Sequence, residues 1–384
     1  MHLIPCGILY EGFRNVVGNG VAFDPGVACE EIDSLRGRGV SVTPENLHIS
    51  GAANVVMPWH KLADRLSEEA LAPGKKLGTT ARGIGPCYSD KATRSTAVRV
   101  ADLLDEQVLG EKVTRVAELK SSLFAGLYGH GDRLDAEAIA REYAGYGRRL
   151  TEMIADTGSI LRQAVAAGER ICFEGGQGSM LDIDHGTFPF VTSSSVTACA
   201  VPSGAGVPPS AVGSVVGVIK CYTSRVGAGP FPTEQDNEIG DLIRERGKEY
   251  GTTTGRPRRC GWLDAVAVRY AADLSGVDEL AVMLLLDGPG KIEKFRVCTA
   301  YELDGRRIDR YDPSLPLDRV ECVYEDVPAW SDPIAPATGF ADLPAEARNY
   351  VERIESLIGR PVGLISVGLG REQTIAHHTK LPAA

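Results

Sequence analysis

The run Val215-Val216-Gly217-Val218-Ile219, followed shortly by Thr223-Ser224-Arg225-Val226-Gly227, indicates the fold of this chain. The first run is short, apolar and rich in β-branched side chains, which is typical of a strand buried inside a sheet. The second run is polar and ends in glycine, as expected of a loop that leaves such a strand. Together they predict a buried strand whose C-terminal end opens into a polar loop.

Three further apolar runs have the same form. They are Ile171-Cys172-Phe173 before residues 174–178, residues 281–286 before Asp287-Gly288, and Leu364-Ile365 before Ser366-Val367-Gly368. In open α/β sheets, ligands bind beyond the carboxyl ends of the strands. We therefore expect the four loops to converge on one site, although for any single loop a simple glycine turn explains the composition equally well.

Two segments have the apolar period of a helix. The first places apolar side chains at positions 150, 153, 154, 161, 164 and 165 and ends near Gly168, and the second runs from Ala347 to Ile358. Asp342 and Pro344 suit the start of the second helix, and Gly359 suits its end. Alternation of such helices with buried strands predicts an α/β protein with a largely parallel sheet.

Composition limits the class of protein. The chain has 384 residues, 43% of them hydrophobic, without an internal repeat or a low-complexity linker, so we expect one domain over residues 1–384. The 51 acidic residues outnumber the 41 basic ones and give a net charge of -10, the wrong sign for a protein that coats nucleic acid. Nine scattered cysteines, without metal-ligand spacing, indicate reduced thiols and a cytoplasmic protein. No apolar run approaches the roughly 20 residues of a membrane span, and no signal peptide is recognisable.

Two polar loops have the composition of anion-binding sites. One is Lys248-Glu249-Tyr250-Gly251-Thr252-Thr253-Thr254-Gly255-Arg256-Pro257-Arg258-Arg259, with four cations and three threonine hydroxyls. The other is Gly78-Thr79-Thr80-Ala81-Arg82-Gly83-Ile84-Gly85-Pro86, followed by Asp90-Lys91 and Arg94. Glycines let the backbone approach a ligand, and arginines match the geometry of phosphate or carboxylate. For the loop at residues 248–259, a solvated basic surface is the alternative interpretation.

Several long blocks of the sequence resemble the adenylosuccinate synthetase family. They are residues 78–86, 173–178, 181–194, 225–234, 251–262 and 366–368, which follow the order of the family over nearly the whole chain. Members of this family join IMP to L-aspartate at the expense of GTP, through 6-phosphoryl-IMP. The resemblance implies a cytoplasmic homodimer that uses Mg²⁺, with a single P-loop-NTPase-like α/β domain around a mostly parallel central sheet.

The resemblance also implies roles for individual residues. The IMP-binding positions correspond to Thr80, Arg94, Gln177, Thr192 and Arg256, with Arg94 acting from the neighbouring subunit and Gln177 stabilising the phosphorylated intermediate. The aspartate-binding positions correspond to Thr252, Thr253, Thr254, Gly255, Arg256 and Arg258. The GTP-binding positions correspond to Arg258, Leu285, Leu286, Asp287, Ser366, Val367 and Gly368. Taken alone, the hydroxyls of Thr80 and Thr192 are better explained as local turn-stabilising contacts than as ligand contacts.

Two segments of the family pattern do not occur among the 384 residues. These are a Gly-Asp-Glu-Gly-Lys-Gly-Lys phosphate loop with the first strand and an Asn-Asn-Ala-Gly-His segment, which supply the general base, a histidine and the Mg²⁺ ligands. We therefore expect the 384-residue chain alone to be essentially inactive and an in-frame upstream extension to encode both segments. The alternative is a catalytically dead IMP-binding or regulatory paralogue. Asp182, Asp184 and His185 could replace the missing groups, but we expect them to form a hydrogen-bonded turn.

Two substitutions fall at the expected nucleotide positions. The family commonly has Thr-Lys-Leu-Asp where this chain has Leu284-Leu285-Leu286-Asp287, and Pro-Asp where it has Leu369-Gly370. The lost lysine makes the nucleotide preference less certain than IMP binding. Another purine monophosphate or another amine donor therefore stays open as the substrate.

Overall fold

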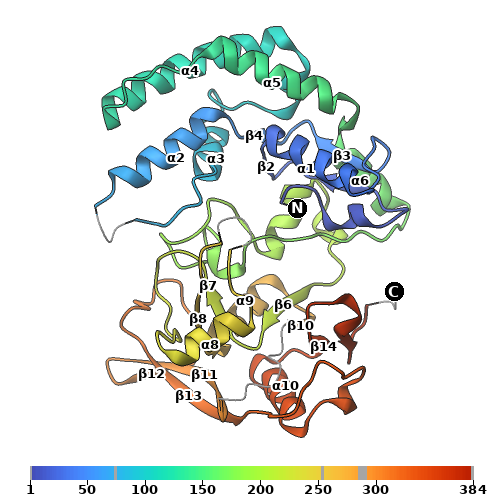
Figure 1. Ribbon diagram of the computed structural model, residues 1–384, viewed down its shortest axis with the longest axis vertical. Helices are drawn as coiled ribbons and strands as arrows, with labels where there is room; N and C mark the ends of the chain where they lie inside the picture. The colour runs from blue at the N-terminus through green and yellow to red at the C-terminus, as the bar shows by residue number, and fades with distance from the viewer. Residues whose placement is uncertain (1, 73–75, 252–254, 284–291, 382–384) are drawn as a thin grey trace. The chain divides into compact units, whose positions relative to one another are not determined.

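The computed structural model describes residues 2–72, 76–251, 255–283 and 292–381 (Figure 1). The chain divides into two compact units. The first consists of Met1–Gln177, Thr192–Val196 and Ala200–Val212, and the second of Gly178–Val191, Thr197–Cys199 and Gly213–Ala384. The single domain over residues 1–384 stays a prediction.

The first unit packs helices around short parallel strands. Its helices are α1 (Pro25–Gly37), α2 (Pro58–Ala70), α3 (Ile84–Thr93), α4 (Glu106–Tyr128), α5 (Ala136–Leu150), α6 (Thr157–Ala166) and α7 (Val201–Ala205). Its strands are β1 (Asn15–Val17), β2 (Ala22–Phe23), β3 (Leu47–Ser50), β4 (Asn54–Val55) and β5 (Ile154–Ala155). Parallel pairing gives the order β1-β3-β5 and a separate pair β2-β4. Helices α4 and α5 pack along one another (Figure 1), and Trp59 and Ile49 are fully buried in this core.

The second unit contains the larger sheets. Its strands are β6 (Val216–Lys220), β7 (Thr223–Arg225), β8 (Arg259–Gly261), β9 (Leu263–Asp264), β10 (Glu279–Met283), β11 (Lys294–Leu303), β12 (Arg306–Ile308), β13 (Glu321–Pro328), β14 (Val362–Ser366) and β15 (Thr374–Ala376). Its helices are α8 (Glu238–Arg246), α9 (Ala265–Ser275) and α10 (Ala345–Ile358). One sheet has the order β15-β14-β10-β6, in which β10 runs parallel to both β6 and β14. A second has the order β12-β11-β13, in which β11 is antiparallel to both neighbours, and β9 pairs parallel to β11. Strands β7 and β8 form a separate antiparallel pair.

An aromatic cluster fills the core of the second unit. The ring centroid of Phe295 lies 4.9 Å from that of Trp330 and 5.2 Å from that of Tyr350. The Tyr350 hydroxyl donates to the carbonyl of Cys221 at 2.6 Å, so its buried polar atom is satisfied. The cluster packs α10 against β11, and the Tyr350 hydroxyl links α10 to the residue that follows β6.

Several predicted elements are confirmed. Strands β6, β10 and β14 form where the apolar runs predicted them, and α10 ends at Gly359, whose φ of 72° favours glycine. Because β6, β10 and β14 are parallel, their C-terminal ends lie at the same edge of the sheet. The α/β class with mostly parallel pairing is therefore confirmed, although the described parallel strands are divided among separate sheets.

Two predicted elements are wrong. Ile171-Cys172-Phe173 forms no strand, because no described strand pairs with it and its side chains stay partly or fully exposed. The helical pattern from residue 150 to residue 165 is interrupted, because Ile154 and Ala155 pair with β3 as strand β5. The Asp156 side chain then accepts the amide of Ser159 at 3.0 Å and starts α6 as a new helix.

The structure contains free cysteines, and its described helices are not of the membrane-spanning kind. All nine cysteines are free thiols, and Cys29, Cys87, Cys221, Cys260 and Cys298 are buried. Within the described residues, no helix has both the length and the apolar character needed to cross a bilayer.

Candidate functional site

A buried carboxylate organises the basic loop of the second unit. Glu249 is 1% exposed and accepts hydrogen bonds from the Tyr222 hydroxyl at 2.6 Å and from Nη1 of Arg258 at 2.7 Å. It also forms an ion pair with Lys220, the last residue of β6. The Arg258 amide donates to the Glu249 carbonyl at 2.9 Å. The arginine is thus fixed beside the carboxyl end of a parallel strand, where the sequence predicted a ligand.

The charge state of this cluster follows from its contacts. Burial alone would raise the pKa of Glu249, but hydrogen bonds from Lys220, Tyr222 and Arg258 outweigh it and lower the pKa below its ordinary value. Burial, and next the hydrogen bond to Glu249, raise the pKa of Tyr222. Near neutral pH the cluster therefore holds one carboxylate, a neutral phenol and two cations.

Two other arginines bind backbone carbonyls and, for Arg259, the Glu234 carboxylate. Arg259 donates through Nε to Glu234 at 2.7 Å and through Nη1 to the Gly229 carbonyl at 2.8 Å. Arg225 donates to the carbonyls of Ala228 and Phe190, both at 2.9 Å, and burial followed by the nearby Arg259 lowers its pKa to about 10. These contacts fold the block around β7 and β8. Some of the arginines that the sequence offered as anion-binding residues therefore stabilise the fold. Arg256, on the same loop as Arg259, is exposed.

The turn after β14 has a fixed backbone. The Ser366 hydroxyl donates to the Gly368 carbonyl at 2.6 Å, and the amide of Val367 donates to the carbonyl of Gln373 at 2.9 Å. Ser366 and Val367 are buried, so this segment offers a ligand mainly its backbone. The predicted residues Thr252, Thr253, Thr254, Leu285, Leu286 and Asp287 lie outside the described residues.

In the first unit, the loop that carries Thr80 packs against α2. Gly83 has a φ of 77°, and a Cβ atom there would lie 2.7 Å from the backbone of His60, so this position requires glycine. Its amide donates to the buried Asp64 carboxylate at 2.9 Å. These contacts fix the loop at one end and leave the side chain of Thr80 exposed.

A second buried carboxylate supports Arg94. Asp90 contacts His60 Nε2 at 2.8 Å and accepts from Thr96 Oγ1 at 2.8 Å and from Lys120 Nζ at 2.7 Å. Burial alone would raise the pKa of Asp90, but these hydrogen bonds lower it overall. The carbonyl of Asp90 accepts the amide of Arg94 at 2.8 Å at the end of α3. The backbone of Arg94 is therefore held firmly, while its side chain is exposed.

The segment that carries Thr192 lies close to the start of α3. A Cβ atom on Gly85 would lie 3.0 Å from the Ser193 hydroxyl oxygen, a tighter approach than most side chains allow. Thr192 itself is half-buried. The structure therefore brings the Thr192 segment beside the loop that carries Thr80, within the first unit.

Backbone strain marks the same loops. Five described residues other than glycine have positive φ, namely Ala81 (52°), Arg94 (68°), Gln177 (58°), Lys248 (50°) and Asp304 (52°). Asp304 precedes Gly305 in the turn between β11 and β12, where an aspartate is tolerated. The other four lie in or beside the loops that the sequence singled out. Since strained residues gather at ligand sites, this coincidence is independent support for a ligand-binding role of each loop.

Comparison with known proteins identifies the family. The family model for adenylosuccinate synthetase matches residues 1–375. The enzyme of that name from Acetivibrio thermocellus is 49% identical over 376 residues, which cover 98% of this chain and 87% of that protein. The chain belongs to the adenylosuccinate synthetase family. It is therefore a ligase of purine biosynthesis that forms a C–N bond.

Other relatives agree with this family assignment. Adenylosuccinate synthetase from Exiguobacterium sp. is 47% identical, with 98% of this chain and 86% of the relative covered. The solved structure of fully ligated adenylosuccinate synthetase from Plasmodium falciparum matches with a TM-score of 0.91 and 34% identity, over 98% of this chain and 88% of that one. The α/β fold expected for the family is thereby confirmed, and the non-catalytic alternative is not favoured.

The turn at Asp182 is confirmed as structural in this adenylosuccinate synthetase family member. Its buried carboxylate accepts hydrogen bonds from the amides of Asp184 at 3.0 Å, His185 at 3.2 Å and Thr197 at 3.4 Å.

The sequence prediction missed the anchoring role of Glu249. The available signal was that Glu249 is the single acidic residue in a stretch with four cations.

Proposed function

We propose that the protein catalyses the GTP-dependent ligation of IMP and L-aspartate to adenylosuccinate, through 6-phosphoryl-IMP, in AMP biosynthesis. The observation that carries this proposal is the family match over residues 1–375. Transfer of the γ-phosphoryl group to the purine oxygen makes a good leaving group, which the aspartate amine then displaces. Such chemistry depends chiefly on positioning and on cations that neutralise developing charge.

For IMP, we propose Thr80, Arg94, Gln177, Thr192 and Arg256. The side chains of Thr80, Arg94, Gln177 and Arg256 are exposed, as residues that contact a ligand must be before it binds. Gln177 is proposed to hydrogen-bond the phosphorylated intermediate. Its left-handed backbone conformation supports a positioned rather than an incidental side chain.

For L-aspartate, we propose Thr252, Thr253, Thr254, Gly255, Arg256 and Arg258. The carboxylates of the substrate would accept charge-assisted hydrogen bonds from the two guanidinium groups. For GTP, we propose Arg258, Leu285, Leu286, Asp287, Ser366, Val367 and Gly368. The fixed turn after β14 supports the backbone part of this assignment.

Mg²⁺, a homodimer and a cytoplasmic location belong to the same proposal. The donors described at the candidate site are guanidinium, amide and hydroxyl groups, and its buried carboxylates Glu249 and Asp90 are occupied by cations of the protein. These groups do not fit a magnesium site, since Mg²⁺ prefers carboxylate and water oxygens. We therefore assign no step to a metal held by the described residues.

The test is product formation from three substrates. Protein expressed with any in-frame codons upstream of Met1 is mixed with IMP, GTP, L-aspartate and Mg²⁺, and adenylosuccinate and phosphate are measured. We expect equal amounts of both products and none when one substrate is left out. In parallel, calorimetry with IMP is run on the 384-residue chain. Heat with IMP but no turnover by either protein would favour the binding-only paralogue, and no heat with IMP would contradict the proposed site.

Arg94 provides a test of the proposed dimer. We expect Arg94→Ala homodimers to be inactive and mixed dimers with an Arg256→Ala subunit to regain part of the activity, because one of the mixed sites would have both arginines intact. Activity is measured after the two variants are unfolded together and refolded. Mixed dimers without recovered activity would reject action of Arg94 from the neighbouring subunit.

A further inference from the structure

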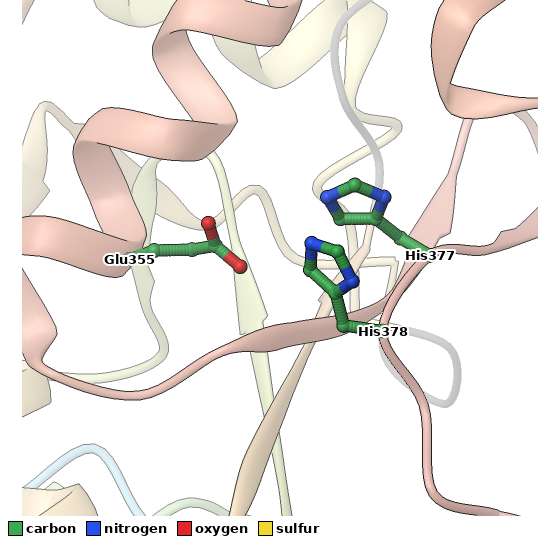
Figure 2. Close-up of side chains that lie close together, drawn as sticks. All are labelled: Glu355, His377 and His378. Atoms are coloured by element: carbon green, nitrogen blue, oxygen red, sulfur yellow. The ribbon is translucent and has the colours of Figure 1, made fainter.

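A cluster of three side chains that could bind a metal ion lies in the second unit. Figure 2 shows the carboxylate of Glu355, on α10, directed toward the imidazoles of His377 and His378. One ligand atom from each residue lies within 4.8 Å of the other two. In the described part of the chain, this is the one group of three or more such side chains with this geometry.

The fold itself assembles the cluster. Successive side chains of a strand point to opposite faces, but the chain bends just after β15, at His377 and His378, and brings their ring centroids within 3.7 Å. The amide of His377 donates to the carbonyl of Gly363 at 2.8 Å. The ring of Phe340 stacks on His377 with a centroid distance of 3.8 Å and restricts its rotation.

Glu355 is oriented by a backbone contact. It lies in the last turn of α10, and its Oε1 accepts the amide of Val362 at 2.6 Å. Oε2 and the remaining lone pair of Oε1 can still bind a cation. The hydrogen bond therefore orients the carboxylate and leaves it able to bind a metal ion. Side chains that coordinate a metal ion are typically oriented by such a hydrogen bond.

We propose that Glu355, His377 and His378 bind a divalent transition-metal ion of the zinc type. Two imidazole nitrogens and one carboxylate oxygen suit Zn²⁺, whereas Mg²⁺ and Ca²⁺ prefer sets of oxygen ligands. Three protein ligands leave a fourth tetrahedral position for water.

The location of the site indicates a structural role. Val362 begins β14 and Ser366 ends it, so the cluster and the predicted nucleotide segment lie at opposite ends of this strand, about 13 Å apart along it. Just beyond the histidines, Thr379 Oγ1 and the amide of Lys380 donate to Glu279 at 2.8 and 2.9 Å. A bound ion would add a second attachment of this C-terminal segment, to α10.

The test uses Zn²⁺ for affinity and Co²⁺ for the ligand type. Calorimetry of the full 384-residue chain should show one Zn²⁺ bound per chain, with affinity reduced by about 100-fold or more in His378→Ala and in Glu355→Gln. His130→Ala, which changes a histidine of the first unit, should bind as the wild type does. Zn²⁺ should also raise the thermal unfolding midpoint of the wild type but not of His378→Ala.

The Co²⁺ spectrum separates this site from the exposed thiols of Cys6, Cys172 and Cys199. We expect tetrahedral d–d bands without a thiolate-to-cobalt charge-transfer band, and loss of the d–d bands in His378→Ala. His378 is exposed, so its variant should fold, as circular dichroism would verify. Binding that carries the thiolate band, binding unchanged in both ligand variants, or no binding at all would each overturn the proposal.

Discussion

Glu249→Gln is expected to lower the free energy of unfolding by about 3 kcal/mol. Glutamine fills the same volume but leaves Lys220 and Arg258 without their buried counter-charge, and breaking such a pair costs about 3–5 kcal/mol. We place the value at the lower end because the two cations are 27% and 28% exposed, so water compensates in part. Urea unfolding at neutral pH, followed by circular dichroism, measures the difference.

The loss should depend on pH with a defined sign. Because the folded-state pKa of Glu249 is lowered, its stabilisation is present above the unfolded-state pKa of about 4.3 and disappears as pH falls through the folded-state value. The difference between wild type and Glu249→Gln should therefore be constant from neutral pH down to about 5 and shrink below that.

Glu238→Gln is the matched control, because Glu238 is exposed at the start of α8 in the same unit. It should change the free energy of unfolding by less than about 0.5 kcal/mol. Equal losses in the two variants, or a loss in Glu249→Gln that is independent of pH, would show that the buried cluster does not stabilise the fold as described.

The elements that the sequence predicted correctly are those with strong local signals. Strand β6 is a compact apolar run, and α10 combines a helical period with a glycine that ends it. The run at residues 171–173 has the same local composition but forms no strand, because a strand needs a partner that sequence alone does not supply. Similarly, Ile154 fits a helical period, yet pairing with β3 and the cap at Asp156 override it.

For the candidate site too, local sequence features were predicted and long-range contacts were not. Residue types that suit anions made the loops around Arg94 and Arg256 stand out in the sequence, and strained backbone at Arg94 and Lys248 supports this prediction. Composition marks Glu249 as the one acidic residue of its loop but does not reveal its partners, because Lys220 and Tyr222 lie 29 and 27 residues earlier in the chain. Such long-range pairs are decided by folding, not by local composition.

Arg256→Ala is expected to reduce kcat/KM for adenylosuccinate formation by about 100-fold or more in protein with the proposed activity. The residue is proposed to contact both IMP and L-aspartate, and removing one partner of a charged hydrogen bond to a bound ligand costs about 2–5 kcal/mol. Arg258 cannot replace it, because its Nη1 and its amide already bond to Glu249. Steady-state kinetics with each substrate varied in turn would show which contacts are lost.

Lys248→Gln is the control for this prediction. It removes a cation from the same exposed loop at a position without an assigned ligand, and glutamine keeps the length of the side chain. We expect kcat/KM within about twofold of the wild-type value, because charge on the loop alone gives only a weak, screened attraction. Equal losses in Lys248→Gln and Arg256→Ala would show that the loop acts through its general charge. Unchanged kcat and KM in Arg256→Ala would remove Arg256 from the site, and a loss confined to Arg256→Ala would mean that the planar guanidinium at this one position holds the substrates.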